Sequence, residues 1–286
     1  MYIDFTFYIF KNLILYILIH NNTYIYNIMA TTIRLNASEL AVITGHNKYQ
    51  DINELTEKIL IRNRLKKGEI IRTDIQKKLV QIQDKQILQT IKKELKLSEQ
   101  STKKDIEKKI NTMCIAPQLD KQTEQESHAN LHKILEQTPV VKKLLEKSTY
   151  SDLIKARGTH NEESSLNHSE KKNKIVIQKR NNRLYTRVLY SDDVCIIIVQ
   201  GKIDGMIGTD TVVESKNRSR RLFYKIPAYE KVQLEAYLYL TQTKKALHIE
   251  NYNEMTNEQY YDHDKLFWDE CSEKLITYVT HKLLSM

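Results

Sequence analysis

The chain has 286 residues, and its 45 lysines and arginines outnumber its 36 aspartates and glutamates, which gives a net charge of +9 and an isoelectric point near 9.1. This length, with 41% hydrophobic residues, allows one core of ordinary size, alone or with a helical appendage. The three cysteines form no C-x-x-C pair and no G-x-x-x-x-G-K-[ST] segment occurs, which argues against a disulfide scaffold, a cysteine metal site and a nucleotide-driven motor.

The positive charge favours an anionic partner, of which nucleic acid is the commonest. A solvated, lysine-rich surface explains the same charge in a chain rich in Ile, Asn, Lys and Tyr, so we give the charge little weight. The widely spaced cysteines favour a reducing, intracellular compartment.

Residues 1–28 differ from the rest because residues 5–19 are almost wholly apolar, interrupted by Thr6, Lys11 and Asn12. A membrane-spanning helix needs about 20 apolar residues, and no small-residue cleavage site of a secretory signal follows this run. Met29 begins a segment that looks like a natural start. We therefore expect residues 1–28 to be an upstream extension, with a membrane anchor as the alternative.

Residues 29–149 are predicted to be helical and rich in lysine. The first helix begins at Asn36 and breaks near Gly45, and Asn53 caps a second helix that ends at Gly68. Further helices are expected over 74–97, 102–113, 121–137 and 139–148. A solvated face explains the lysines more simply than a dedicated DNA-binding arm, although such a helical annex can add phosphate contacts.

Residues 150–286 change in character and are predicted to form an α/β (α+β) domain, a mixed central β-sheet flanked by helices. A short helix precedes a polar loop at 167–173, and strands at 174–179 and 183–190 surround a turn at Asn181. A helix begins at Pro227. A strand over 245–252 and a long closing helix over 258–284 complete the order.

A hairpin over residues 201–216 organises this domain. An apolar run at 195–199 leads to Asp204, and three apolar or β-branched residues lead to Glu214, with a turn at 208–210. Because side chains alternate along a strand, Glu214 and Lys216 point to one face and Ser215 to the other. Two carboxylates and a lysine on one side indicate a metal-dependent hydrolase.

Phosphodiester hydrolysis needs charge neutralisation at the phosphate and an activated water, and Mg²⁺ bound by oxygen ligands supplies both. The candidate ligands are Asp204, Glu214, Glu162 and the backbone carbonyl of Ser215, with Mn²⁺ as a substitute ion. Lys216 would orient the attacking water or stabilise the charge of the transition state. The isolated D-x9-E-x-K pattern is weak evidence in a chain that is 28% charged.

Four blocks of sequence resemble the PD-(D/E)XK nuclease superfamily, and in particular lambda-type exonucleases and YqaJ-like viral recombinases. They are A-S-E-L at 37–40 with T-G at 44–45 and a tyrosine at 49, R-G-T-H-N-E at 157–162, G-K-I-D-G at 201–205 with V-E-S-K at 213–216, and P-A-Y-E-K-V-Q at 227–233. The resemblance implies a restriction-endonuclease-like core.

The resemblance also implies roles for individual residues. Asp204 and Glu214 would bind Mg²⁺, with Glu162 completing the site or serving a second ion, and Lys216 would position the nucleophilic water. Gln233 would hydrogen-bond near the metal and hold its geometry. The resemblance places Ser38 and Arg157 near the DNA phosphates. Apart from the resemblance, we expect contacts to DNA from the basic side chains Lys202, Arg218, Arg220, Arg221 and Lys225.

By the resemblance, the chain is expected to degrade double-stranded DNA in the 5′-to-3′ direction, in viral or phage recombination, replication or repair. The implied partners are double-stranded DNA, a single-strand-annealing recombinase and other copies of the same chain, in the host cytoplasm, the nucleus or a viral factory. A structure-specific or nicking endonuclease and a non-catalytic DNA-binding module are the alternatives, because the stretch 68–149 and the basic cluster at 218–221 have no counterpart in the family pattern.

Overall fold

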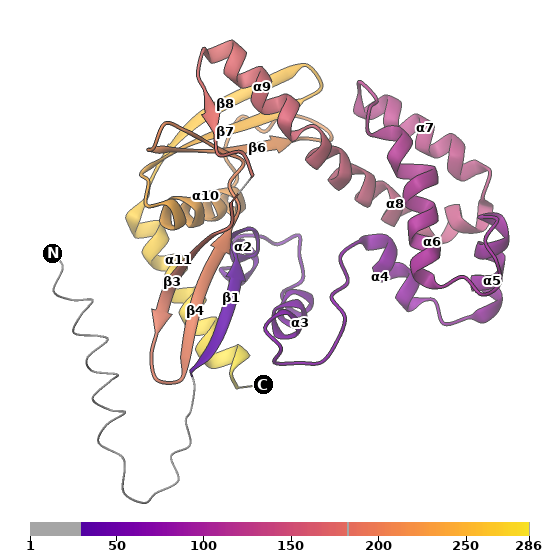
Figure 1. Ribbon diagram of the computed structural model, residues 1–286, viewed down its shortest axis with the longest axis horizontal. Coiled ribbons are helices and arrows are strands. Elements are labelled where there is room, and N and C mark those ends of the chain that lie inside the picture. The colour runs from indigo at the N-terminus through magenta and orange to yellow at the C-terminus, as the bar shows by residue number, and fades with distance from the viewer. Residues whose placement is uncertain (1–29, 182, 286) are drawn as a thin grey trace, which may run out of the picture.

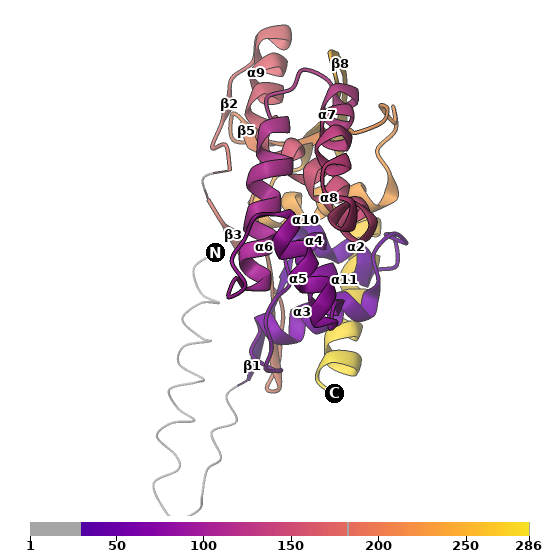
Figure 2. The same ribbon diagram turned by 90° about the vertical axis from the view of Figure 1, so that its right-hand side faces the viewer.

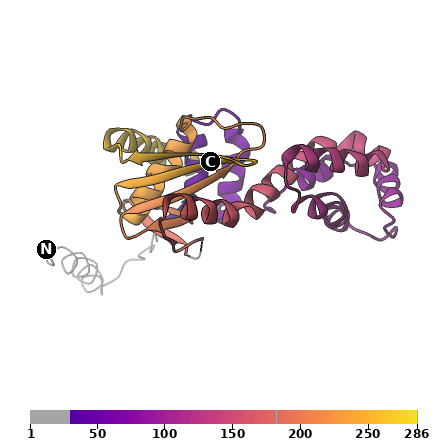
Figure 3. The same ribbon diagram turned by 90° about the horizontal axis from the view of Figure 1, so that it is seen from above.

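Residues 30–181 and 183–285 are described by the computed structural model, so the predictions for residues 1–28 lie outside it. The described chain is a mixed α/β protein with a separate helical region, which confirms the predicted fold class (Figure 1). One end of the molecule holds two β-sheets and the helices that cover them, and the other end holds the helical region (Figures 1 and 3).

Two neighbouring sheets make up the β-structure. The three-stranded sheet has the order β1 (Thr31–Asn36), β4 (Cys195–Gly201) and β3 (Tyr185–Ser191), with β1 parallel to β4. The five-stranded sheet has the order β2 (Ile177–Gln178), β5 (Gly205–Ile207), β6 (Thr211–Asn217), β7 (Lys245–Tyr252) and β8 (Met255–Asp262), with β6 parallel to β7. Both sheets are therefore mixed.

Helix α10 (Ala228–Thr241) packs across both sheets and carries much of the main core. The short helices η1 (Ala37–Glu39) and α2 (Leu40–Ile43), with α3 (Ile52–Arg62), α11 (Lys265–Thr277) and the π-helical turn η4 (Tyr278–Leu283), complete this layer. In β4, alternate residues Cys195, Ile197 and Val199 are fully buried against it, as a half-buried strand requires. On the other face of the five-stranded sheet, α9 (Glu162–Asn173) contributes Leu166 to a small second cluster.

The helical region has a hydrophobic core of its own, built from the apolar faces of its helices. Its elements are α4 (Asp74–Gln81), α5 (Lys85–Glu94), α6 (Lys103–Ile110), the π-helical turn η2 (Asn111–Ile115), η3 (Ala116–Gln118), α7 (Glu124–Glu136) and α8 (Pro139–His160). Viewed from the helical end, these helices stand in front of the sheets (Figure 2). Residue 150, where the sequence analysis divides the chain, lies inside α8.

Several predicted elements are wrong in detail. The single helix expected over 74–97 is two helices, because Asp84 caps a new one after a break at Ile82. The N-cap of α3 is Asp51 and not Asn53. The strands expected at 174–179 and 183–190 exist in shortened form but do not pair with each other, since β2 pairs with β5 and β3 with β4.

Two strands are missing from the sequence analysis. β1 buries only Ile33 and Leu35, and β8 lies at the edge of its sheet with mostly polar, part-exposed residues, so neither carries a strong apolar alternation. β8 also takes the first residues of the predicted closing helix, which begins as α11 at Lys265. Among the described residues, no helix combines the length and apolar character needed to cross a bilayer.

Arg157 has a structural role in place of the predicted contact with DNA. Its side chain is 3% exposed, and its Nε donates to Glu124 Oε1 at 3.0 Å. Its Nη1 donates to the carbonyl oxygens of Gln118, Leu119 and Lys121 at 2.7, 3.2 and 3.0 Å. The guanidinium thus joins α8 to the turn before α7, and these partners leave it unavailable to a phosphate.

Substituting Arg157→Ala should destabilise the protein by about 3–5 kcal/mol, because it leaves the buried Glu124 carboxylate and three carbonyl oxygens without their donor. Thermal unfolding followed by circular dichroism should show a midpoint lowered by roughly 10 °C. Lys147→Ala, at an exposed position of the same helix, is the control and should unfold within about 1 °C of wild type. An Arg157→Ala midpoint equal to that of the control would contradict the structural role.

Candidate active site

The predicted hairpin is present, with β5 and β6 paired antiparallel and Gly208 in the turn at φ +59°. Asp204 lies in the short break between β4 and β5, where the chain passes from one sheet to the other. The glycines on either side of this break are packed too closely for a side chain. A Cβ at Gly201 would lie 2.9 Å from the Tyr237 ring, and one at Gly205 would lie 2.3 Å from Ile177. This packing fixes the path of the chain around Asp204.

Asp204 and β6 are joined by a hydrogen bond, since the backbone N–H of Ser215 donates to Asp204 Oδ2 at 2.7 Å. In a strand the N–H and C=O of one residue point to the same side. The Ser215 carbonyl therefore points toward the side where Asp204 lies. β5 begins at Gly205, opposite Val213, so this strand pairing does not extend to Ser215.

Glu214 and Lys216 share a face of β6, as predicted from their spacing. The Lys216 ammonium donates to Glu214 Oε1 and, at 3.0 Å, to Gln233 Oε1 of α10. Gln233 Nε2 in turn donates to the Tyr237 hydroxyl at 2.8 Å. Because residues four apart lie on one helix face, Gln233 and Tyr237 form a polar stripe that holds the Lys216 side chain in one orientation.

Glu162 begins α9 and reaches the same site from the helical side. Its Oε1 accepts a hydrogen bond from Asn181 Nδ2 at 3.1 Å. Burial and the nearby Glu214 carboxylate raise the pKa of Glu162, against the opposing effect of the Asn181 amide. Burial, together with Glu214 and Glu162, raises the pKa of Asp204 well above its usual value. The three acids predicted as ligands are therefore electrostatic neighbours.

Lys216 is the cation that offsets this negative charge. Burial acts to lower its pKa, but Glu214, which accepts its hydrogen bond, outweighs burial and the pKa is raised. The ammonium therefore stays protonated at neutral pH. This state suits a hydrogen-bond donor and not a general base.

The donor set fits a divalent cation that prefers oxygen. Glu214 Oε2 is buried and has no hydrogen-bond partner, which is a costly state for a carboxylate oxygen and one that a cation relieves. Among the described residues, no group of three or more His, Cys, Asp or Glu is drawn together in the geometry of a metal site. Like charges repel without a cation, and Asp204 and Glu214 each hold a hydrogen bond to a protein donor.

The predicted DNA contacts divide into two groups. Five of these side chains are exposed and remain open to a phosphate: Ser38, Lys202, Arg220, Arg221 and Lys225. Arg218 and Arg157 are enclosed by the protein. The Arg218 side chain is 10% exposed, and its guanidinium donates two hydrogen bonds to Glu230, at 2.6 and 2.8 Å, and one to Glu250 at 2.7 Å. The prediction of a phosphate contact is therefore corrected for Arg218 as for Arg157.

Arg218 is the centre of a buried ionic network that the sequence analysis missed. Glu230 lies in the first turn of α10 and Glu250 in β7, and His248 Nε2 lies 2.8 Å from Glu230 Oε2. A signal was present, because Glu230 interrupts a helix that is otherwise largely apolar on its buried side. Burial acts against the charged form of Glu230, but Arg218 and His248 outweigh it and lower its pKa to about 2.

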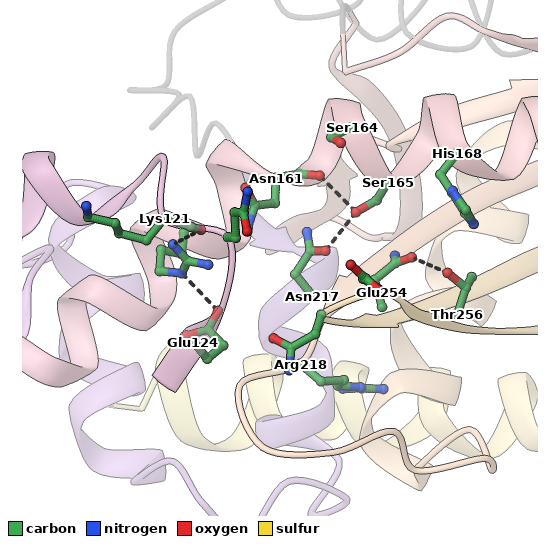
Figure 4. A pocket seen from close by; sticks show the side chains of 14 residues that line it. Lys121, Glu124, Asn161, Ser164, Ser165, His168, Asn217, Arg218, Glu254 and Thr256 are labelled. Atoms are coloured by element: carbon green, nitrogen blue, oxygen red, sulfur yellow. Dashed lines mark hydrogen bonds and ion pairs between the residues drawn. The ribbon is translucent and has the colours of Figure 1, made fainter. Parts of the chain in front are cut away.

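A polar pocket of about 530 Å³ lies between the helical region and the sheets (Figure 4). Asn217 lines it and, by strand alternation, points away from the face of Lys216; its Nδ2 donates to the Gly158 carbonyl at 2.8 Å. Ser165 donates to both Asn161 and Asn217 at the same wall (Figure 4). The pocket and the Glu214 carboxylate therefore lie on opposite sides of β6. The two arginines that line the pocket, Arg157 and Arg218, are already paired with acids.

No family model matches the sequence, and no curated protein matches it. Among solved structures, the chain is similar to an alkaline exonuclease, LHK-Exo, from Laribacter hongkongensis, at 9% identity and a TM-score of 0.48, over 88% of each chain. It is also similar to a phage related exonuclease from Haemophilus somnus 129PT, at 10% identity and a TM-score of 0.33, over 43% of this chain and 67% of that one. A third match, SSO0001, has 11% identity and a TM-score of 0.31, over 81% and 88%.

Substituting Asp204→Asn should stabilise the metal-free protein, because it removes one of three neighbouring charges while its amide oxygen still accepts the Ser215 N–H. The gain should be about 1 kcal/mol, which raises the thermal midpoint in EDTA by roughly 2–4 °C. The matched control is Asp210→Asn at the exposed turn of the same hairpin, expected to unfold within about 1 °C of wild type. A lowered Asp204→Asn midpoint would show that the three acids do not repel one another.

The ionic network predicts a dependence of stability on acid. The pKa of Glu230 is about 2 in the folded protein against 4.5 ordinarily, so its contribution is complete above pH 4.5 and is lost as the pH falls toward 2. Urea unfolding should show a loss of about 3 kcal/mol from this group across that range. Glu230→Gln should lack this part of the loss, whereas the exposed Glu273→Gln should keep the wild-type profile.

Proposed function

We propose that the protein is a Mg²⁺-dependent deoxyribonuclease that hydrolyses phosphodiester bonds of DNA. The observation that carries the proposal is the arrangement on β6. Asp204 accepts a hydrogen bond from the Ser215 N–H, next to Glu214 in the chain, and the Lys216 ammonium is held between Glu214 and Gln233. The same residues carry the resemblance to PD-(D/E)XK nucleases in the sequence.

Asp204, Glu214 and the Ser215 carbonyl would hold the ion, with Glu162 completing the site. A bound Mg²⁺ supplies charge neutralisation at the phosphate and makes a water more nucleophilic. Lys216 donates hydrogen bonds to the attacking water or to the phosphate oxygens, where negative charge develops in the transition state. Gln233 and Tyr237 keep that ammonium oriented, so it needs no rearrangement as the reaction proceeds.

We propose the lambda-type mode, digestion of double-stranded DNA in the 5′-to-3′ direction during viral or phage recombination, replication or repair. A single-strand-annealing recombinase would take up the product strand, and several copies of the chain would assemble around DNA. The sequence resemblance supports this mode. The exposed Lys202, Arg220, Arg221 and Lys225 are available to phosphates, whose negative charges make such contacts favourable and salt-dependent.

Digestion of linear duplex DNA, labelled at the 5′ or the 3′ end, tests the proposal. In Mg²⁺ the wild-type protein should release the 5′ label first as mononucleotide, and EDTA should stop the reaction. Asp204→Ala and Lys216→Ala should each lower the rate by about 100-fold or more while DNA binding is largely kept. Asp210→Ala at the turn is the matched control and should cleave at the wild-type rate.

Two outcomes would redirect the proposal. Cleavage of covalently closed circular DNA would replace the exonuclease with a structure-specific or nicking endonuclease on the same site. Full activity of Glu214→Ala would refute the site itself and leave a DNA-binding module as the better description.

A further inference from the structure

An aromatic and basic pocket of about 650 Å³ opens beside the loop that follows β6. Four of the rings that line it come from three separate parts of the chain: Tyr49 after α2, Phe223 and Tyr224 in the loop, and Tyr229 in α10. Tyr49 is 90% exposed and Tyr224 is 64% exposed. Exposed rings gathered at one concave surface are unusual on a soluble protein and mark a binding surface.

Hydrogen bonds fix the backbone of the loop at two of these rings, Phe223 and Tyr224. Tyr224 has φ +59°, a strained value for an aromatic residue, and is kept there by its N–H, which donates to Glu250 Oε2 at 3.0 Å. The N–H of Phe223 donates to Glu250 Oε1 at 3.3 Å, and the Arg218 guanidinium lies 4.2 Å from the centre of the Phe223 ring. Glu250 is fully buried and the Arg218 side chain is 10% exposed, so the loop backbone at Phe223 and Tyr224 is held by enclosed partners.

Positive charge accompanies the rings. The exposed Arg221 and Lys225 line the same pocket, within the loop that carries Tyr224. Aromatic faces interleaved with cationic side chains are the chemistry that binds single-stranded nucleic acid, in which bases stack on rings and phosphates pair with basic groups. In a fully paired duplex only the outermost base pairs have a free face, because all other bases stack on one another on both sides.

The pocket lies close to the proposed catalytic residues. Tyr229 and Gln233 are four residues apart on α10, so they share a helix face and are separated by about 6 Å along its axis. Gln233 contacts Lys216 and Tyr229 lines the pocket, so this face of α10 leads from the Lys216 ammonium toward the pocket.

We propose that this pocket binds unpaired DNA bases next to the site of cleavage. The protein would therefore act on a strand whose end is separated from its complement. The inference rests on the proposed function for its substrate, and it adds a subsite that neither Asp204 nor Glu214 provides. Tyr224 and Tyr49 supply the stacking faces, and Arg221 and Lys225 pair with the adjoining phosphates.

Fluorescence anisotropy tests this proposal on the full chain in EDTA, where no cleavage is required. The probes are a labelled oligothymidylate of about ten nucleotides, within the usual site size, and an abasic strand of equal length. The wild-type protein should bind the oligothymidylate about 10-fold more tightly or better. The double variant Tyr49→Ala with Tyr224→Ala should lose this preference, and the same double change to Phe should keep it.

Three further variants separate stacking from folding, from charge and from the mere exposure of a ring. Tyr224→Gly removes the ring and relieves the positive φ, so it should be at least as stable as wild type and yet bind the oligothymidylate more weakly. Arg221→Gln should weaken both probes alike. Tyr260→Ala removes an equally exposed ring, 64% accessible on β8, and should bind both probes as wild type does.

Equal affinity of wild type for the two probes, or unchanged binding by Tyr224→Gly, would overturn the inference and show that only charge holds the strand. The nuclease proposal is tested separately by cleavage of duplex DNA in Mg²⁺. If the protein binds the oligothymidylate through Tyr224 but cleaves no DNA, the proposed binding pocket stands and the proposed nuclease activity is refuted.

Discussion

The electrostatic repulsion among three neighbouring carboxylates, with one part-buried ammonium beside them, is the constraint on which the rest of the site depends. Glu162, Asp204 and Glu214 raise the free energy of the folded protein by their mutual repulsion, and Lys216 offsets only part of it. The Ser215 N–H and the Gln233 amide hold two of the charged groups where they are. Such an arrangement costs stability, and a cation bound by these carboxylates, as proposed above, would offset their repulsion.

The ionic network of Arg218 connects the strand that carries Glu214 to the exposed loop at Phe223 and Tyr224. Arg218 directly follows β6, whose last residue is Asn217, and it binds Glu230 at the start of α10 and Glu250 in β7. Glu250 also fixes the backbone of the loop at Phe223 and Tyr224. One set of ionic hydrogen bonds therefore joins the start of the helix that carries Gln233 to the loop that exposes Phe223 and Tyr224.

Local patterns predicted the placement of Asp204, Glu214 and Lys216 better than they predicted the surroundings of these residues. Asp204, Glu214 and Lys216 lie within one hairpin, so strand alternation and a glycine turn were enough to bring them together. Arg157 and Arg218 were assigned to DNA because charge alone does not reveal a partner. Their carboxylates, Glu124 and Glu250, lie 33 and 32 residues away in the sequence, and only the fold brings them near. The edge strand β8 was missed for a related reason, since its pairing with β7 and not its own pattern makes it a strand.

Helix α8 connects the helical region to the candidate site. This helix begins in the separate helical core, carries Arg157 near its end, and ends at His160. Only Asn161 separates it from α9, which begins with Glu162. Between Arg157 and Glu162, the Gly158 carbonyl accepts a hydrogen bond from Asn217 of β6 at 2.8 Å. The position of Glu162 thus depends on contacts made on both sides of it, to the helical region through Arg157 and to the sheet through Asn217. A movement of the helical region along α8 would displace the third carboxylate from the other two, so this region is a structural support of the site and not only a basic appendage.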